Sequence, residues 1–80
     1  MMTHQELLVK LAEIFETSPD QLTEDASPNQ IPGWESVAAL GVISLLDDAG
    51  VGEITTEDAA AFKTIGAILA FAKIRGILTD

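Results

Sequence analysis

The chain has 80 residues, of which 48% are hydrophobic, and this is enough for one small domain with its own core. It has no cysteine, which excludes disulfides and thiolate metal sites, and its net charge of −9 disfavours binding to nucleic acid and to anionic membranes. Twelve of the thirteen acidic residues lie within residues 1–58, which would attract a partner with a basic surface or simply keep the chain in solution. The first residues carry no cationic segment, and the longest charge-free run, residues 36–46, is too short to cross a bilayer, so we expect a cytoplasmic monomer.

The first predicted helix begins after Thr3, which forms a capping-box pattern with Glu6. Apolar residues then recur on one face with helical spacing, and Pro19 should end the helix because the residue before a proline avoids the helical conformation. The predicted buried face consists of Leu7, Leu8, Leu11, Ala12, Ile14 and Phe15.

Residues 17–35 are predicted to form a long, solvent-exposed loop that contains all three prolines of the chain. A loop of this length in a compact domain is often functional. Leu22, Ile31 and Trp34 need burial, so we expect a short turn near residues 19–22 and apolar anchors that hold the loop against the helices.

The second helix is predicted over residues 36–49, with a stop signal at Gly50 and Gly52. Its expected buried stripe consists of Val37, Leu40, Ile43 and either Leu46 or Leu45. Gly41 lies inside this helix at a cost of about 1 kcal/mol relative to alanine. It marks either the close approach of another helix or a glycine tolerated without purpose.

Two further helices complete the pattern: a short one capped by Thr55 and extending to Phe62, and a longer one capped by Thr64 and ending at Gly76. The apolar face of the last helix consists of Ile65, Ile68, Leu69, Ala72 and Ile74. No alternating strand pattern and no repeat interrupts this order. The sequence therefore predicts an all-α fold in a single domain over residues 1–80: a small four-helix bundle with three longer helices, a short third helix and a long loop between the first two.

Most kinds of site chemistry lack the residues they require. His4 is the only histidine, and a calcium loop starting at Asp47 would need oxygen ligands where Ala49 and Val51 stand. Gly50 and its neighbours lack the third glycine and the preceding strand of a dinucleotide loop. Ser36 has no nearby base to activate it, so we expect neither a metal site nor an enzyme. A serine at a helix start is left with two roles: to cap the helix, or to carry a phosphate ester at the positive end of the helix dipole.

The motif at residues 33–37, Gly-Trp-Glu-Ser-Val, stands at the start of the second predicted helix. Together with the acidity, the helix order and the long first loop, it resembles the acyl carrier protein family, the phosphopantetheine carriers of fatty-acid, polyketide and related pathways. The attachment motif of that family is Asp-Ser-Leu at the start of its second helix, often preceded by Gly-Trp or Gly-Ala. Residues 54–58 (ITTED) and 62–66 (FKTIG) resemble the family's Ile-Pro-Asp-Glu-Asp and Thr-Val-Gly-Asp segments, so the resemblance covers residues 6–77.

The resemblance implies that Ser36 carries 4′-phosphopantetheine, installed from coenzyme A by a phosphopantetheinyl transferase with magnesium. The thiol of this arm would hold acyl or aminoacyl groups as thioesters for loading and acyl-transfer enzymes with basic docking surfaces. The implied partner-recognition residues are Glu35, Val37, Ala38, Gly41, Asp47 and Asp48. The residues that could contact a nonpolar cargo between the second and third helices are Val37, Leu40, Ile54 and Phe62.

Three positions differ from the family's pattern. Glu35 replaces the usual aspartate and is a poorer N-cap, because its longer side chain misses the first amides of the helix. Val37 replaces leucine, and Ala67 stands where an aspartate is common. The second helix is also less charged at its centre, which favours a specialised stand-alone carrier with its own partner enzymes. The alternative is a carrier-like helical bundle that is never modified and acts as a protein interaction module.

Overall fold

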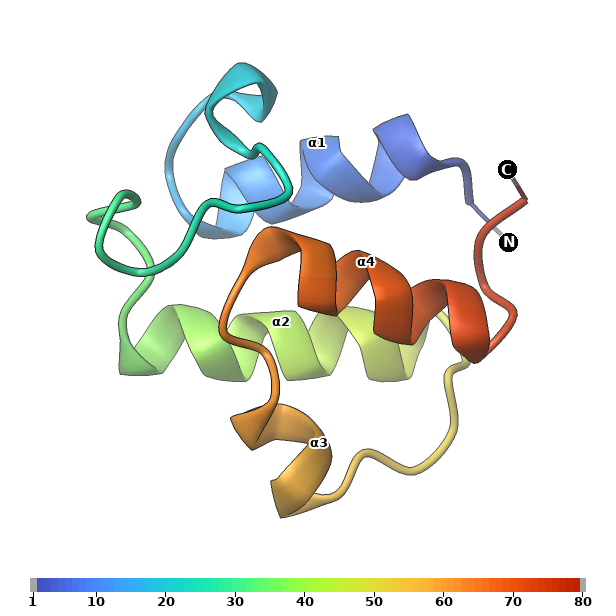
Figure 1. Cartoon of the computed structure of the whole chain (residues 1–80). Helices are drawn as coiled ribbons and strands as arrows, with labels where there is room; N and C mark the ends of the chain where they lie inside the picture. Colours follow the sequence, from blue (N-terminus) through green and yellow to red (C-terminus); the bar gives the residue numbers. More distant parts are fainter. Residues whose placement is uncertain (1, 80) are drawn as a thin grey trace.

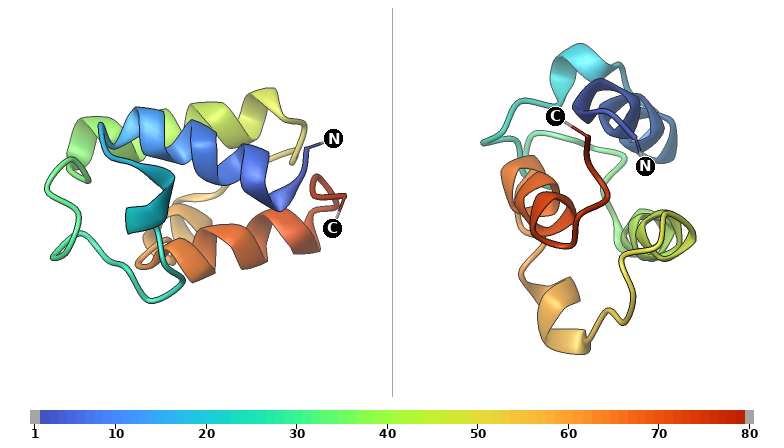
Figure 2. Two further views of the ribbon diagram at one scale, coloured as in Figure 1. Left: turned by 90° about the horizontal axis from the view of Figure 1, so that it is seen from above. Right: turned by 90° about the vertical axis from the view of Figure 1, so that its right-hand side faces the viewer.

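The computed structural model describes residues 2–79, and within them it contains four α-helices and no strand. The helices are α1 (His4–Ile14), α2 (Ser36–Asp48), α3 (Thr56–Ala60) and α4 (Ile65–Ile74), and a single 3-10 turn, η1 (Pro19–Gln21), lies in the first loop. The three longer helices run alongside one another, and the short α3 lies on the side of the bundle opposite α1, beside α2 and α4 (Figures 1 and 2). The predicted all-α bundle with a short third helix is thus confirmed.

The two ends of the described chain meet at one end of the bundle (Figure 1). The Met2 N–H donates to the Ile77 carbonyl at 3.0 Å, and the Thr79 N–H donates to the Met2 carbonyl at 2.9 Å. Within residues 2–79, none of the helices combines the length and the apolar character that crossing a bilayer requires.

Local capping fixes where three of the helices begin, as predicted. Thr3 and Glu6 form a complete capping box on α1, and Thr55 and Asp58 form another on α3. The hydroxyl of Thr64 accepts a hydrogen bond from the third residue of α4 at 3.1 Å. These hydrogen bonds replace the intrahelical partners that the first amides of a helix lack.

The helix ends show one difference from the prediction. α2 and α4 are each followed, one residue after the C-cap, by a glycine, Gly50 and Gly76, whose positive φ angles of 94° and 78° suit glycine. α1 ends before the Pro19 signal, because Glu16 adopts a φ of 55° and turns the chain out of the helix. The Thr17 N–H then donates to the Ala12 carbonyl at 2.9 Å and closes the turn. Glu16 thus takes the left-handed position after the helix that is most often occupied by glycine.

The core is formed by α1, α2, α4 and the anchors of the first loop. The predicted anchors Leu22, Ile31 and Trp34 are all buried, and so is most of the predicted face of α1. Leu8 and Ile14 are only partly buried. On α4 the prediction for Ile74 is wrong: this residue is 82% exposed, because two residues along a helix place it on the face opposite the buried Ala72.

The buried face of α2 also differs from the prediction. Val37 and Leu40 are 75% and 67% exposed, and Ile43 is only half-buried. The predicted Leu46 does enter the core, but it is joined there by Ala38 and Val42. This rotation brings the small side of the helix toward α1: a Cβ atom at Gly41 would lie 3.1 Å from Cγ2 of Ile14. Gly41 therefore marks the close approach of another helix, which is α1 of the same chain.

Candidate functional site

The segment before α2 is fixed on the end of α1 by two neighbouring residues. A Cβ atom at Gly33 would overlap the backbone carbonyl of Phe15, so no side chain fits there. The ring of Trp34 stacks on the ring of Phe15, with centroids 4.8 Å apart and planes 25° from parallel. These contacts fix the point at which α2 starts, and with it the position of Ser36.

Ser36 is the first residue of α2 and is exposed, whereas the N-cap position belongs to Glu35. The Glu35 side chain makes no capping hydrogen bond, as its length predicts. The Ser36 hydroxyl makes no hydrogen bond to any of the described residues 2–79. Of the two roles open to this serine, the structure excludes that of helix cap and leaves the hydroxyl available to a partner.

The N-terminus of α2 differs from those of the other three described helices. At α4, the first two amides donate to carbonyl groups of the first loop: Ile65 to Ala26 at 3.0 Å and Gly66 to Glu24 at 2.8 Å. In α2, the first amide with a partner among residues 2–79 is that of Ala39, which donates to the Glu35 carbonyl at 2.9 Å. The amides before it leave the positive end of the helix dipole unsatisfied beside the Ser36 hydroxyl.

A small apolar pocket of about 50 Å³ lies between α2, α3 and α4. The α2 side of this pocket starts at Ala39, one turn after Ser36, and continues to Ile43, neither of which was predicted to contact a cargo. Among the predicted cargo residues, Phe62 lines the pocket, Ile54 is half-buried beside the core, and Val37 and Leu40 lie outside. The full lining is Trp34, Ala39, Val42, Ile43, Ala59, Phe62 and Ile68.

The predicted partner-recognition residues divide between the surface and the interior. Ala38 is only 7% exposed and Gly41 packs against α1, so neither offers much surface to a partner. Exposed side chains run along the other side of the helix, and we call them the outer face of α2: Glu35, Val37, Leu40, Asp47 and Asp48. This face has an apolar centre with carboxylates at both ends.

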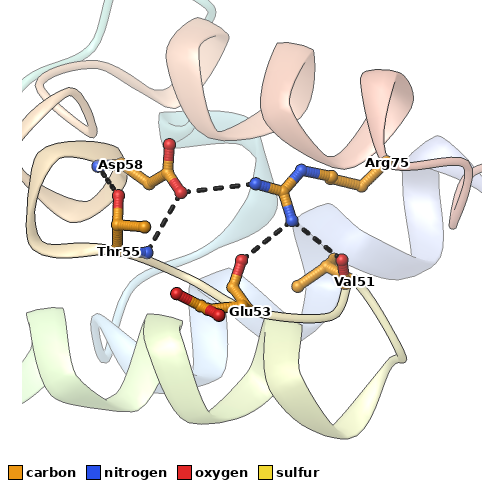
Figure 3. A network of polar contacts seen from close by, with 5 residues as sticks. All are labelled: Val51, Glu53, Thr55, Asp58 and Arg75. Carbon is orange, nitrogen blue, oxygen red and sulfur yellow. Dashed lines mark hydrogen bonds and ion pairs between the residues drawn. The ribbon is translucent and has the colours of Figure 1, made fainter.

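Arg75, at the C-terminal end of α4, joins α4 to the chain around α3 (Figure 3). One guanidinium nitrogen donates to the carbonyls of Val51 and Glu53 at 3.0 and 2.9 Å, and another lies 3.3 Å from the Asp58 carboxylate. A hydrogen bond from the Thr55 backbone N–H to the Asp58 carboxylate holds the pKa of Asp58 below its ordinary value of 3.8, and the charge of Arg75 acts in the same direction. The sequence indicated Arg75 only as a cation near a helix end, because its partners lie 17 to 24 residues earlier in the chain.

Comparison of the chain with families of known proteins, with curated proteins and with solved structures finds no match. The site is therefore interpreted from its own residues. It combines an exposed, unbonded serine hydroxyl, free amides at the start of a helix, and an apolar pocket one turn away.

Proposed function

We propose that this chain is a carrier protein of the acyl carrier type, with 4′-phosphopantetheine attached to the oxygen of Ser36. The observation that carries the proposal is the exposed hydroxyl at the first position of α2, which bonds to no described residue and adjoins free first-turn amides. An anionic phosphodiester on this oxygen would lie next to those amides and to the positive end of the helix dipole, which both favour negative charge.

In this proposal the chain supplies attachment, transport and recognition, and its partners supply the catalysis. A transferase would join the serine oxygen to the phosphorus next to pantetheine in coenzyme A; the pyrophosphate bond breaks, and adenosine 3′,5′-bisphosphate and the serine proton are released. The terminal thiol of the arm would then carry an acyl or aminoacyl group as a thioester. Tethering keeps the group at high effective concentration near each enzyme that the carrier meets. The apolar pocket would shelter the first atoms of a nonpolar cargo.

The outer face of α2 suits the docking of such partners. Val37, next to the attachment point, and Leu40, one turn further on, provide an apolar centre. Glu35, Asp47 and Asp48 provide carboxylates before and after it. With a net charge of −9, the chain would steer a basic surface toward this face during encounter. Partners with an apolar patch bordered by lysine or arginine fit this description.

Mass spectrometry tests the proposal directly. The chain is incubated with coenzyme A, magnesium and a phosphopantetheinyl transferase of broad specificity, and is then weighed. We expect a gain of one phosphopantetheine in the wild type and none in Ser36→Ala. Ser44→Ala is the matched control, because Ser44 is exposed on the same helix two turns later, and it should be modified like the wild type. Failure of several transferases to modify the wild type would refute the proposal.

The second candidate is a protein interaction module that is never modified. The exposure of Val37 and Leu40 favours it, since two large apolar side chains on one helix face suit a protein interface with or without an arm. The mass of the chain purified from its native host separates the two candidates. An unmodified mass, with partner capture retained by Ser36→Ala, would support the module, and a phosphopantetheine adduct would exclude it.

A further inference from the structure

The chain from Gly50 to Phe62 forms a flap over the apolar pocket, and few of its side chains hold it down. None of the residues of α3 is buried, and Val51 is the one fully buried residue of the flap. Phe62, at the other end, is half-buried and meets the ring of Phe71 edge-on at 5.1 Å. Between these two residues, Ile54 is half-buried against the core and Ala59 lines the pocket. The flap thus has only a few apolar contacts with the rest of the bundle, which is typical of segments that open locally.

Polar contacts with Arg75 supply the missing attachment (Figure 3). Its guanidinium group binds the carbonyls of Val51 and Glu53 before α3 and the carboxylate of Asp58 within α3. The same group lies 4.5 Å from the centre of the Phe71 ring, which helps to orient it toward the flap. One side chain of α4 therefore holds both the loop and the helix of the flap.

The closed flap leaves the pocket small. Ala59 and Phe62 form its flap side, and its volume is about 50 Å³. This is far below the roughly 300–1,000 Å³ of pockets that hold small molecules, so an extended acyl chain does not fit while the flap is closed. A larger apolar group can enter only if α3 moves away from α2 and α4.

We propose that Arg75 is a positioning residue that latches this flap and thereby sets the capacity of the pocket. Release of the guanidinium group from Asp58 and from the two carbonyls would free residues 52–61 while α1, α2 and α4 stay packed. The assignment of the pocket to a cargo rests on the carrier function proposed above. The latch itself does not, and it is tested on the full, unmodified chain.

Hydrogen–deuterium exchange compares the wild type with Arg75→Ala and Arg75→Lys. We expect the amides of residues 56–62 to exchange at least tenfold faster in Arg75→Ala, and those of α1 and α2 to change less than twofold. Arg75→Lys should give an intermediate increase, because an ammonium group cannot reproduce the guanidinium fork. Lys73→Ala is the matched control: it removes an exposed cation from the same end of α4, one that forms no hydrogen bond or ion pair with described residues of the flap, and it should leave the flap unchanged.

Binding of the apolar dye 8-anilinonaphthalene-1-sulfonate provides a second readout. Its fluorescence should rise at least threefold with Arg75→Ala, and adding Ala59→Leu, which fills the pocket, should reverse the rise. Unchanged exchange in the flap would overturn the latch, and so would equal acceleration in all helices, which indicates a merely structural role. If Arg75→Ala does not fold, Arg75→Lys decides between the same outcomes. Failure of Ser36 modification would refute the carrier function and leave these readouts unaffected.

Discussion

Replacement of Gly33 by alanine tests whether the segment before α2 packs against the end of α1 as closely as the structure indicates. The added Cβ atom would overlap the backbone carbonyl of Phe15, and no change of rotamer can relieve a clash between a Cβ and a backbone atom. The φ angle of Gly33 is one that alanine can adopt, so backbone strain does not contribute. The segment before α2 must therefore move away from the end of α1.

The magnitude follows from what that movement separates. The stacked pair of Phe15 and Trp34 contributes about 1 kcal/mol beyond its burial. Exposure of half the buried surface of Trp34, about 100 Å², costs about 2.5 kcal/mol at 25 cal/mol per Å². We expect the free energy of unfolding to fall by about 3 kcal/mol, which in a domain of this size lowers the melting temperature by more than 10 °C.

Urea unfolding followed in parallel by circular dichroism and by fluorescence of the single tryptophan measures this loss. Gly41→Ala is the matched control. Its Cβ would approach Cγ2 of Ile14 at 3.1 Å, which requires a shift of only a few tenths of an ångström by a partly buried side chain. Alanine gains about 1 kcal/mol of helix propensity, so the net change should be small. If Gly33→Ala unfolds at the same urea concentration as Gly41→Ala, the close approach of Gly33 to Phe15 does not exist in solution.

Three other substitutions, the first with its own control, probe the helix ends. Glu16→Gly should raise the free energy of unfolding by about 0.5–1 kcal/mol, because the φ of 55° suits glycine. The control Glu13→Gly, in the last turn of α1, should lower it by about 1 kcal/mol. Equal changes of the two variants in thermal unfolding would contradict this. Ser36→Ala should shift the urea midpoint very little, since the hydroxyl bonds no described residue, and a loss above 1 kcal/mol would mean that it caps α2 after all. The hydrogen bond from Thr55 lowers the pKa of Asp58 in the folded state, so its stabilisation is complete above about pH 5 and is lost as the pH falls through that lowered pKa. In Asp58→Asn, the free energy of unfolding should therefore fall less between about pH 5 and pH 2 than in the wild type. An unchanged fall over this range would argue against the capping box.

The elements that the sequence predicts well are those set by neighbouring residues. Thr3, Thr55 and Thr64 cap helices through hydrogen bonds that span three residues, so the capping pattern is readable in a short window. The buried face of α2 was not predictable in this way. Residues 36–46 are apolar or small nearly throughout, so no polar side marks the exterior, and periodicity assigned Val37 and Leu40 to the core.

Contacts between distant parts of the chain account for the rest of what the sequence could not show. The glycine of the motif at residues 33–37 was visible, but its reason is the carbonyl of Phe15 on another helix. Arg75 reaches a loop and a helix that lie more than 15 residues earlier. Such contacts depend on how the helices pack together, which a pattern of spacings along one chain does not specify.

Glu35 connects the local physics of α2 to its proposed role. An aspartate at the N-cap would fold back and accept hydrogen bonds from the first amides of α2, whereas Glu35 leaves those amides free for a phosphate on Ser36. Glu35→Asp should therefore raise the free energy of unfolding of the unmodified chain by about 1 kcal/mol and reduce the stability gained on modification. Thermal unfolding of both forms measures this, with Glu53→Asp, in an exposed loop, as control. If Glu35→Asp stabilises neither form, the amides of α2 are already satisfied in solution, and the open helix start gives no reason to place a phosphate there.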